Sequence, residues 1–257
     1  MPKEDNNELV ISFLKIRRLI GLLGILLPGL CLLINYVFIK YEILDKSLFV
    51  TKEWSACFVS SMYCKPTISD YFYSPATVVF TGILITVSVF LFCYHGYKEK
   101  SGIDKFPFLT DNLMTNIAAI SLLGVAIFPT QPKNEIKDNV FAFTSSEFIG
   151  TIHFICAIIF FISISLLCII NFRRTGKSRD FGNEMSDKIY LFCGIGMLIM
   201  IICMSIYILY HRNRSDINSD STFFWLETVA LILFGFAWLV KGKIYKTKMA
   251  EKIRNIF

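Results

Sequence analysis

Residues 68–97 read ISDYFYSPATVVFTGILITVSVFLFCYHGY, a polar and aromatic entry followed by Ser74-Pro75 and a long run without charge. Ser74 is a favourable N-cap, and Pro75 suits the first helical position, where its missing N–H costs nothing. An uncharged run of this length can cross the roughly 30 Å hydrocarbon core of a bilayer as a helix. The stretch therefore predicts a transmembrane helix over 75–97 with one carboxylate, Asp70, fixed at its mouth.

The composition of the whole chain agrees with this interpretation. Its 257 residues are 54% hydrophobic and have a mean hydropathy of +0.57, which indicates several long apolar segments. A net charge of +6 would suggest nucleic acid as the partner of a soluble protein. Here the basic segments lack interleaved aromatic residues and are better explained as cytoplasmic loops facing anionic lipid. Membrane lipids, and no nucleic acid, are the expected partners.

Six apolar runs predict an all-α, six-helix transmembrane bundle. Asp111 is the expected N-cap of the third helix, and Thr144-Ser-Ser-Glu147 has the pattern of a capping box for the fourth. Gly21 and Gly24 permit a close helix contact. A polar segment, 1–18, precedes the bundle and a basic tail, 241–257, follows it. The predicted spans are 19–39, 75–97, 112–129, 148–172, 189–210 and 223–240.

The distribution of Lys and Arg predicts the orientation of the bundle. Alternate loops carry 18 of the 26 basic residues on the side that holds both termini, and this bias marks the cytoplasmic side. We therefore expect both termini in the cytoplasm, with the chain in a plasma membrane, such as a bacterial inner membrane. Of the eight Cys, only Cys57 and Cys64 lie outside the spans, and the sequence leaves open whether they form a disulfide.

This topology brings several polar residues to one membrane level, the outer interface. Asp70 precedes the second helix, whereas His153 and Glu227 lie in the second turns of the fourth and sixth. Ionisable residues inside a span usually face the bundle interior with a partner and mark a functional site. The residues expected to line the same pocket are Ser69, Tyr71, Tyr73, Thr130, Tyr207 and His211.

Three interpretations of these residues remain open. In the first, Asp70, His153 and Glu227 form a pocket that binds a lipid headgroup or performs acid–base chemistry on it, with Ser69 as nucleophile or polar contact. In the second, they hold a metal ion together with His211, although their spacing matches no metal-binding motif. In the third, His153 and Glu227 hydrogen-bond across helices and Asp70 anchors the second helix. The pattern predicts neither a metal nor a cofactor.

Four blocks of the chain carry a family resemblance: SISDYFYSP, GVAIFPT, IHFICAIIFF and FWLETVALILFGFAWLVKG. In their order and spacing they resemble small bacterial six-helix membrane proteins of unknown function. More remotely, they resemble the eukaryotic DRAM-like family, which includes autophagy modulators and proteins tied to GPI-anchor lipid remodelling. The resemblance implies a six-helix fold and a recurring pattern of Ser69, Asp70, His153 and Glu227.

The preferred function is therefore a membrane protein that binds or remodels lipid through an outward-facing polar pocket. If it is an enzyme, His153 is the expected base, oriented by Glu227 or Asp70. The alternatives are a transporter or channel for a small solute or ion, and a structural or interaction protein without a ligand. A transporter would need a continuous polar path, whereas the middle of helices two, four and six is nearly free of polar residues.

Overall fold

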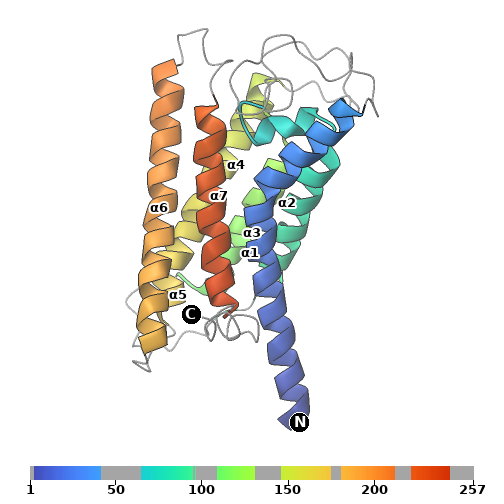
Figure 1. Ribbon diagram of the computed structural model, residues 1–257. Coiled ribbons are helices and arrows are strands. Elements are labelled where there is room, and N and C mark those ends of the chain that lie inside the picture. Colours follow the sequence, from blue (N-terminus) through green and yellow to red (C-terminus); the bar gives the residue numbers. More distant parts are fainter. Residues whose placement is uncertain are drawn as a thin grey trace, which may run out of the picture.

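The computed structural model describes residues 3–41, 65–94, 96, 109–130, 146–174, 181–211 and 221–243. All regular structure within these ranges is helical, which confirms the all-α prediction. The fourth helix continues through a π-helical turn, η3, into the short α5, so that six rods result, as predicted (Figure 1). The elements are α1 (Lys3–Lys40), η2 (Ser69–Tyr73), α2 (Thr77–Phe92), α3 (Asp111–Ile127), α4 (Glu147–Leu166), η3 (Leu167–Asn171), α5 (Phe172–Arg174), α6 (Phe181–His211) and α7 (Thr222–Lys241).

Four segments are long and apolar enough to cross a membrane. The helices α2 and α3 are equally apolar in character but shorter, with 16 and 17 residues. The chain is therefore a multi-span helical membrane protein. The four long segments are Ser12–Phe38, Glu147–Asn171, Glu184–Tyr210 and Thr222–Lys241.

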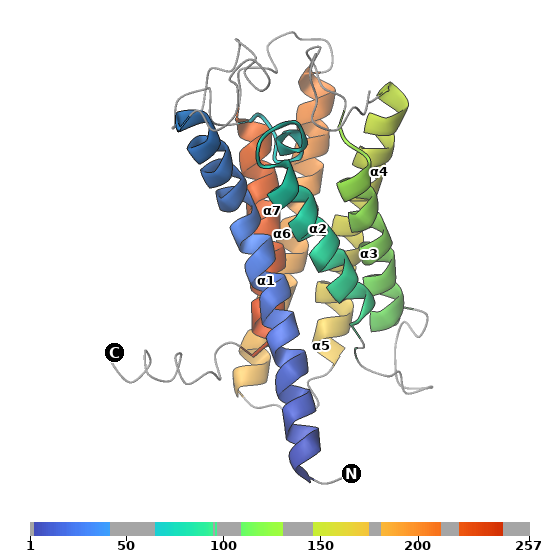
Figure 2. The ribbon, with the colours of Figure 1, turned by 90° about the vertical axis from the view of Figure 1, so that its right-hand side faces the viewer.

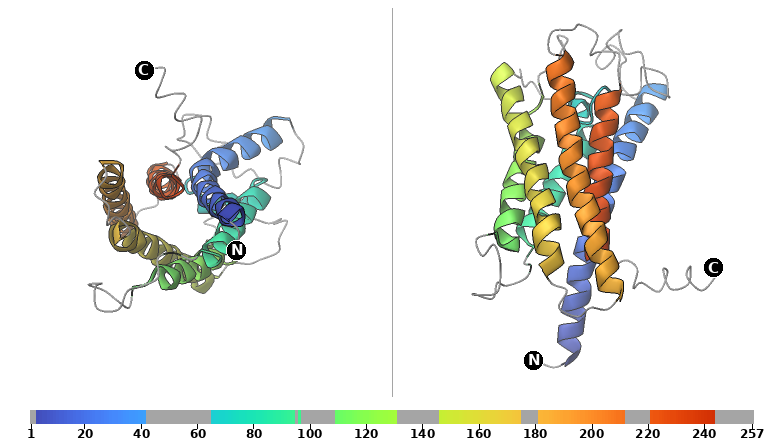
Figure 3. Two further views of the ribbon diagram at one scale, coloured as in Figure 1. Left: turned by 90° about the horizontal axis from the view of Figure 1, so that it is seen from below. Right: turned by 90° about the vertical axis from the view of Figure 1, so that its left-hand side faces the viewer.

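The six rods run in alternating directions and close into a ring. Each rod packs on the next one along the chain, and α7 packs back on α1 (Figures 2 and 3). The first residues of α1 and the last residues of α7 lie at the same end of the bundle (Figure 1). At the opposite end, α2, α4 and α7 begin beside the ends of α1, α3 and α6. An alternating ring of this kind brings the starts of three helices together, as the sequence analysis expected.

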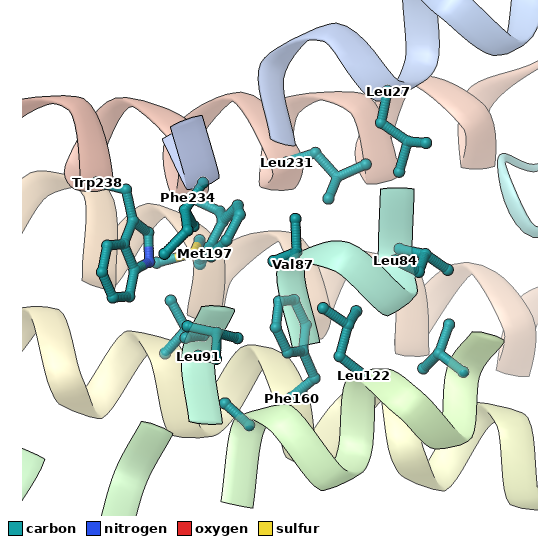
Figure 4. Packing of buried hydrophobic residues seen from close by; sticks show 14 of the residues in the cluster. Leu27, Leu84, Val87, Leu91, Leu122, Phe160, Met197, Leu231, Phe234 and Trp238 are labelled. Carbon is teal, nitrogen blue, oxygen red and sulfur yellow. The ribbon is translucent and has the colours of Figure 1, made fainter. Parts of the chain in front are cut away.

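The middle of the bundle is filled by apolar side chains from every rod (Figure 4). Some of the buried polar side chains hydrogen-bond to backbone carbonyls: Ser88 donates to Ala119 over 2.7 Å and Thr228 to Phe224 over 2.7 Å. The buried hydroxyl of Ser165 has no hydrogen-bond partner among the described residues. The described interior is therefore mostly apolar, with a few buried hydroxyls between the polar clusters at its two ends. The labelled core residues are Leu27, Leu84, Val87, Leu91, Leu122, Phe160, Met197, Leu231, Phe234 and Trp238.

The entry to α2 differs from the prediction. Its helix begins at Thr77, with Ala76 as the N-cap, and Ser74 instead closes the preceding 3-10 helix. The Ser74 hydroxyl donates to the Tyr71 carbonyl over 2.8 Å and accepts from the Ala76 N–H over 3.1 Å. Because both contacts lie within the turn, Ser74 fixes the turn geometry and does not cap the helix.

Two other predicted caps are shifted by one or two residues. Thr110, not Asp111, is the N-cap of α3, and its side chain accepts from the Leu113 N–H over 3.2 Å. Ser146, not Thr144, is the N-cap of α4. Several residues suitable for capping precede each helix, and the chain uses the one directly before the first helical turn.

One predicted boundary differs at the start of the chain, and the boundary at its end is largely untested. The segment 1–18, predicted to precede the bundle, is largely a helical extension of α1, which begins at Lys3. The predicted basic tail 241–257 lies outside the described residues beyond residue 243. Within the bundle, α2 ends at Phe92, before the predicted residue 97, and α6 begins at Phe181, before the predicted residue 189.

Glycines make the contact between α1 and α7 close. A Cβ built on Gly21 would lie 2.5 Å from the Gly235 carbonyl oxygen, and one built on Gly235 would collide with the Gly21 carbonyl. The predicted close contact at Gly21 and Gly24 is confirmed, and it joins the first and last rods of the ring. By contrast, a Cβ on Gly82 would meet nothing within 4 Å.

Gly235→Ala is therefore expected to lower the stability of the detergent-solubilised protein by about 1–3 kcal/mol, because backbone atoms on both sides must move apart. Gly82→Ala is the matched control. It should be neutral or stabilising by up to about 1 kcal/mol, since it only removes the entropic cost of a glycine within a helix. Thermal unfolding of both variants measures this, and equal stability would contradict the close α1–α7 contact.

Candidate functional site

A polar cluster lies at the bundle end where α2, α4 and α7 begin. The segment 65–74, which includes η2, crosses this end of the bundle (Figure 2). It brings Ser69 and Asp70 to residues of three other helices that are distant in the sequence. The two side chains central to the cluster are nearly inaccessible, with 8% of Ser69 and 2% of His153 exposed.

The imidazole of His153 is held on both sides. Its Nδ1 lies 2.7 Å from the Phe128 carbonyl oxygen, and its Nε2 lies 2.9 Å from Ser69 Oγ. A carbonyl oxygen can only accept, so Nδ1 of the neutral ring carries the proton. Nε2 is then the acceptor, and the Ser69 hydroxyl donates to it. The hydrogen bonds thus assign the tautomer in which Nε2 can receive a proton.

The Phe128 carbonyl is available because α3 ends there. Pro129 disfavours the helical conformation in the residue before it, and Phe128 adopts an extended conformation with φ −93° and ψ 109°. Its carbonyl therefore leaves the helical hydrogen-bond pattern and turns to His153 on the neighbouring α4. The sequence analysis identified Pro129 as the end of a helix but missed this consequence.

Glu227, in the second turn of α7, binds the same segment from the other side. Its Oε2 accepts from the Ile68 N–H over 2.5 Å, and its Oε1 lies 3.5 Å from Ser69 Oγ. Ser69 therefore stands between a ring nitrogen and a carboxylate. Its single hydroxyl proton is directed to His153, the nearer of the two acceptors.

Asp70 lies on the side of the cluster that faces α3. Thr130 Oγ1 donates to Asp70 Oδ1 over 3.3 Å, and the Tyr73 hydroxyl donates to the Thr130 carbonyl over 2.6 Å. The Asp70 N–H is bound by Thr67 Oγ1 over 3.0 Å. These contacts join η2 to the end of α3, so Asp70 and Thr130 hold the segment that carries Ser69.

Tyr71 and Lys65 also hold the segment 65–74 in place. Tyr71 is fully buried, its ring packs 6.4 Å from that of Phe224, and its hydroxyl accepts from the Lys65 N–H over 3.3 Å. Burial lowers the pKa of the Lys65 ammonium to about 8, and the negative charge of Asp70 opposes this shift. Lys65 is a further charged residue of this region that sequence reasoning did not identify, because its burial follows only from the folded segment.

Other predicted site residues lie elsewhere or are not described. Tyr207 is half-buried on α6 and packs its ring 6.0 Å from that of Phe223. His211 is the last residue of α6, and its side chain lies outside the described residues. Cys57 and Cys64 fall outside them as well, so their pairing stays a prediction.

Two of the alternatives can be compared with this geometry. His153 and Glu227 do not hydrogen-bond to each other directly; both instead bind the Ile68–Ser69 segment between them. The direct interhelical bond was therefore wrong, because Ile68 and Ser69, at the start of η2, lie between His153 of α4 and Glu227 of α7. Within the ranges the structure covers, no three His, Cys, Asp or Glu side chains gather as metal ligands would.

The arrangement has a defined chemical capacity. A hydroxyl that donates to a neutral imidazole, itself oriented through its other nitrogen, is the geometry of an activated nucleophile and its general base. In this cluster a backbone carbonyl orients the ring, and a carboxylate stands on the far side of the hydroxyl.

In comparisons with protein-family models, with curated proteins and with solved structures, none matched this chain.

Lys65 makes the stability of the protein depend on pH. Its pKa in the folded protein, about 8, lies below the ordinary value of 10.5, so the unfolded chain binds the proton between these values. Stability is therefore expected to rise with pH across this window, by at most about 1 kcal/mol per pH unit. Unfolding of the solubilised protein at pH 7.5–10.5 measures the slope.

Lys65→Met should remove this part of the slope. Lys188→Met is the control, because the exposed Lys188 only pairs with Glu184 over 2.9 Å, and it should keep the wild-type slope. A slope unchanged in Lys65→Met would show that other groups cause it.

Proposed function

We propose that this protein binds and remodels membrane lipid at the Ser69–His153–Glu227 cluster. The observation that carries the proposal is the hydrogen bond between the Ser69 hydroxyl and His153 Nε2, with Glu227 beside the same hydroxyl. A purely structural bridge needs no titratable base next to a hydroxyl. Polar groups of this kind inside apolar helices are costly to bury and mark functional sites in membrane proteins.

Lipid is the ligand class favoured by the surroundings of the cluster. Large apolar side chains are exposed at the same end of the bundle, including Phe148 at the start of α4 (73% exposed) and Trp225 at the start of α7 (51%). Ile206 and Leu209 near the end of α6 are exposed as well. These exposed side chains favour a ligand that is itself partly apolar. The resemblance to a family with members tied to lipid remodelling suggests the same class.

The membrane and its orientation are part of the proposal. The Lys and Arg bias places both termini in the cytoplasm of a plasma membrane, such as a bacterial inner membrane. The cluster then lies at the outer interface, where lipid headgroups and ester bonds are found. The apolar core at mid-height speaks against a transporter or channel, because a solute path would have to cross it (Figure 4).

Lipid analysis of cells that express the wild type, His153→Ala, Asn171→Ala or no protein tests the proposal. Asn171 is a matched control: it is equally buried and makes two hydrogen bonds, to Leu109 and Asp111, but at the opposite end of the bundle. Mass spectrometry should find a several-fold change in the amount of one lipid class. The change is measured either in the total lipid of the cells or in the lipid that co-purifies with the protein. The change should occur with wild type and Asn171→Ala and be lost with His153→Ala.

The two kinds of change separate remodelling from binding. An altered total lipid pool indicates remodelling, whereas selective co-purification without such a change indicates binding. If folded wild type and folded His153→Ala give the same lipids in both measurements, the proposal is wrong and the cluster only stabilises the bundle.

A further inference from the structure

We infer that Ser69 is an acyl-accepting nucleophile, with His153 as its general base, and that the substrate is a carboxylic ester of a membrane lipid. The inference rests on the proposed function and specifies its reaction. It follows from three features of the described residues: the direction of the Ser69 hydroxyl proton, the fixed tautomer of His153, and the large apolar side chains exposed at the same end of the bundle.

The protonation pattern is the first step. The Phe128 carbonyl holds the proton of His153 on Nδ1, so the lone pair on Nε2 points at Ser69 Oγ over 2.9 Å. This distance lies within the range for a nucleophile and its base. The 2% exposure of the ring keeps water from competing for Nε2.

The reaction can be written with all atoms and protons accounted for. Ser69 Oγ attacks the ester carbonyl carbon while its proton passes to His153 Nε2. The carbon–oxygen bond to the alcohol portion of the lipid then breaks, and the Nε2 proton passes to the departing oxygen. The acyl group remains on Ser69 as an ester. Water or the hydroxyl of a second lipid next gives its proton to Nε2 and attacks the acyl carbon. The bond from the acyl carbon to Ser69 Oγ then breaks, the Nε2 proton returns to Oγ, and the acyl group leaves as a carboxylic acid or as a new ester.

Glu227 acts in this scheme as a positioning residue. Its Oε2 holds the Ile68 N–H, directly before Ser69, and fixes the serine on a segment that lies between α4 and α7. Its Oε1 lies 3.5 Å from Ser69 Oγ, a longer distance than the 2.9 Å between Ser69 Oγ and His153 Nε2. Removal of the carboxylate should loosen the serine without removing the base, whereas loss of His153 removes the base itself.

The substrate class follows from what surrounds the nucleophile. Phe148 and Trp225 are exposed at this end of the bundle and favour a substrate with apolar chains. On α6 every described side chain beyond Met197 is at least partly exposed, so the half of this helix nearest the cluster is the less covered half. Apolar chains can lie against these side chains while an ester group reaches the cluster. A lipid acyl ester has both the apolar chains and the ester group.

A covalent probe tests the inference on the full-length protein. The protein is reconstituted in nanodiscs of phosphatidylethanolamine and phosphatidylglycerol and treated with a long-chain alkyl fluorophosphonate, which an activated serine attacks at phosphorus with release of fluoride. Peptide mass spectrometry should find the adduct on Ser69 of the wild type. This first measurement needs no variant, so it does not depend on whether a substituted protein folds.

Three variants then test the mechanism. His153→Gln keeps hydrogen-bonding groups near Phe128 and Ser69 but offers no base, and it should reduce the labelling rate at least a hundredfold. Glu227→Gln should reduce it less. Ser88→Ala is the matched control, because the hydroxyl of this buried serine donates to the Ala119 carbonyl from within α2, away from Ser69, and it should label at the wild-type rate.

The outcomes separate this inference from the proposed function. Absence of an adduct on Ser69 in folded wild type, or equal labelling of wild type and folded His153→Gln, would overturn the nucleophile. Selective lipid co-purification would then still support lipid binding. Labelling of Ser69 without any lipid difference between wild type and His153→Ala would support the nucleophile and refute the proposed action on cellular lipid.

Discussion

The hydrogen bond from the Ile68 N–H to Glu227 is the interaction on which the site depends. The segment before α2 is not part of a long helix, so its backbone groups need partners inside the bundle. Glu227 on α7 supplies one partner, Thr130 at the end of α3 binds Asp70, and His153 on α4 binds Ser69. Three helices thus hold one short segment, and the serine it carries has a single position between them.

The bundle separates its polar groups from its core. At one end the Ser69 cluster joins η2 to α3, α4 and α7. At the other end Asn171 in the π-helical turn binds Asp111 at the start of α3 over 2.8 Å, and Tyr94 lies near the same carboxylate. Between them, aromatic and aliphatic side chains from all six rods fill the interior, and the glycine contact of α1 with α7 closes the ring. The two polar clusters of the described residues therefore lie at opposite ends of the bundle.

The sequence was sufficient for the number of helices, and it placed Asp70, His153 and Glu227 at one level. Apolar runs give helices directly, and alternation of direction sorts helix starts to one end. Contacts between distant residues could not be predicted in this way. The bond of His153 to Phe128 depends on the conformation that Pro129 imposes, and the burial of Lys65 depends on how the segment 65–74 folds. The caps at Thr110 and Ser146 differ from prediction because neighbouring residues were equally suited to the role.

The two polar ends of the bundle also differ in what they can do. An asparagine amide, as in Asn171, donates and accepts hydrogen bonds but neither gains nor loses a proton near neutral pH. It suffices to tie α3 to the π-helical turn. At the other end the acceptor is an imidazole, whose basic nitrogen faces a hydroxyl while a carbonyl fixes the remaining nitrogen. A bundle that needed only a polar contact there could use an amide again. The imidazole nitrogen that faces the Ser69 hydroxyl is the reason to propose chemistry at the Ser69 end, whereas at the other end Asp111 is held by the Asn171 amide.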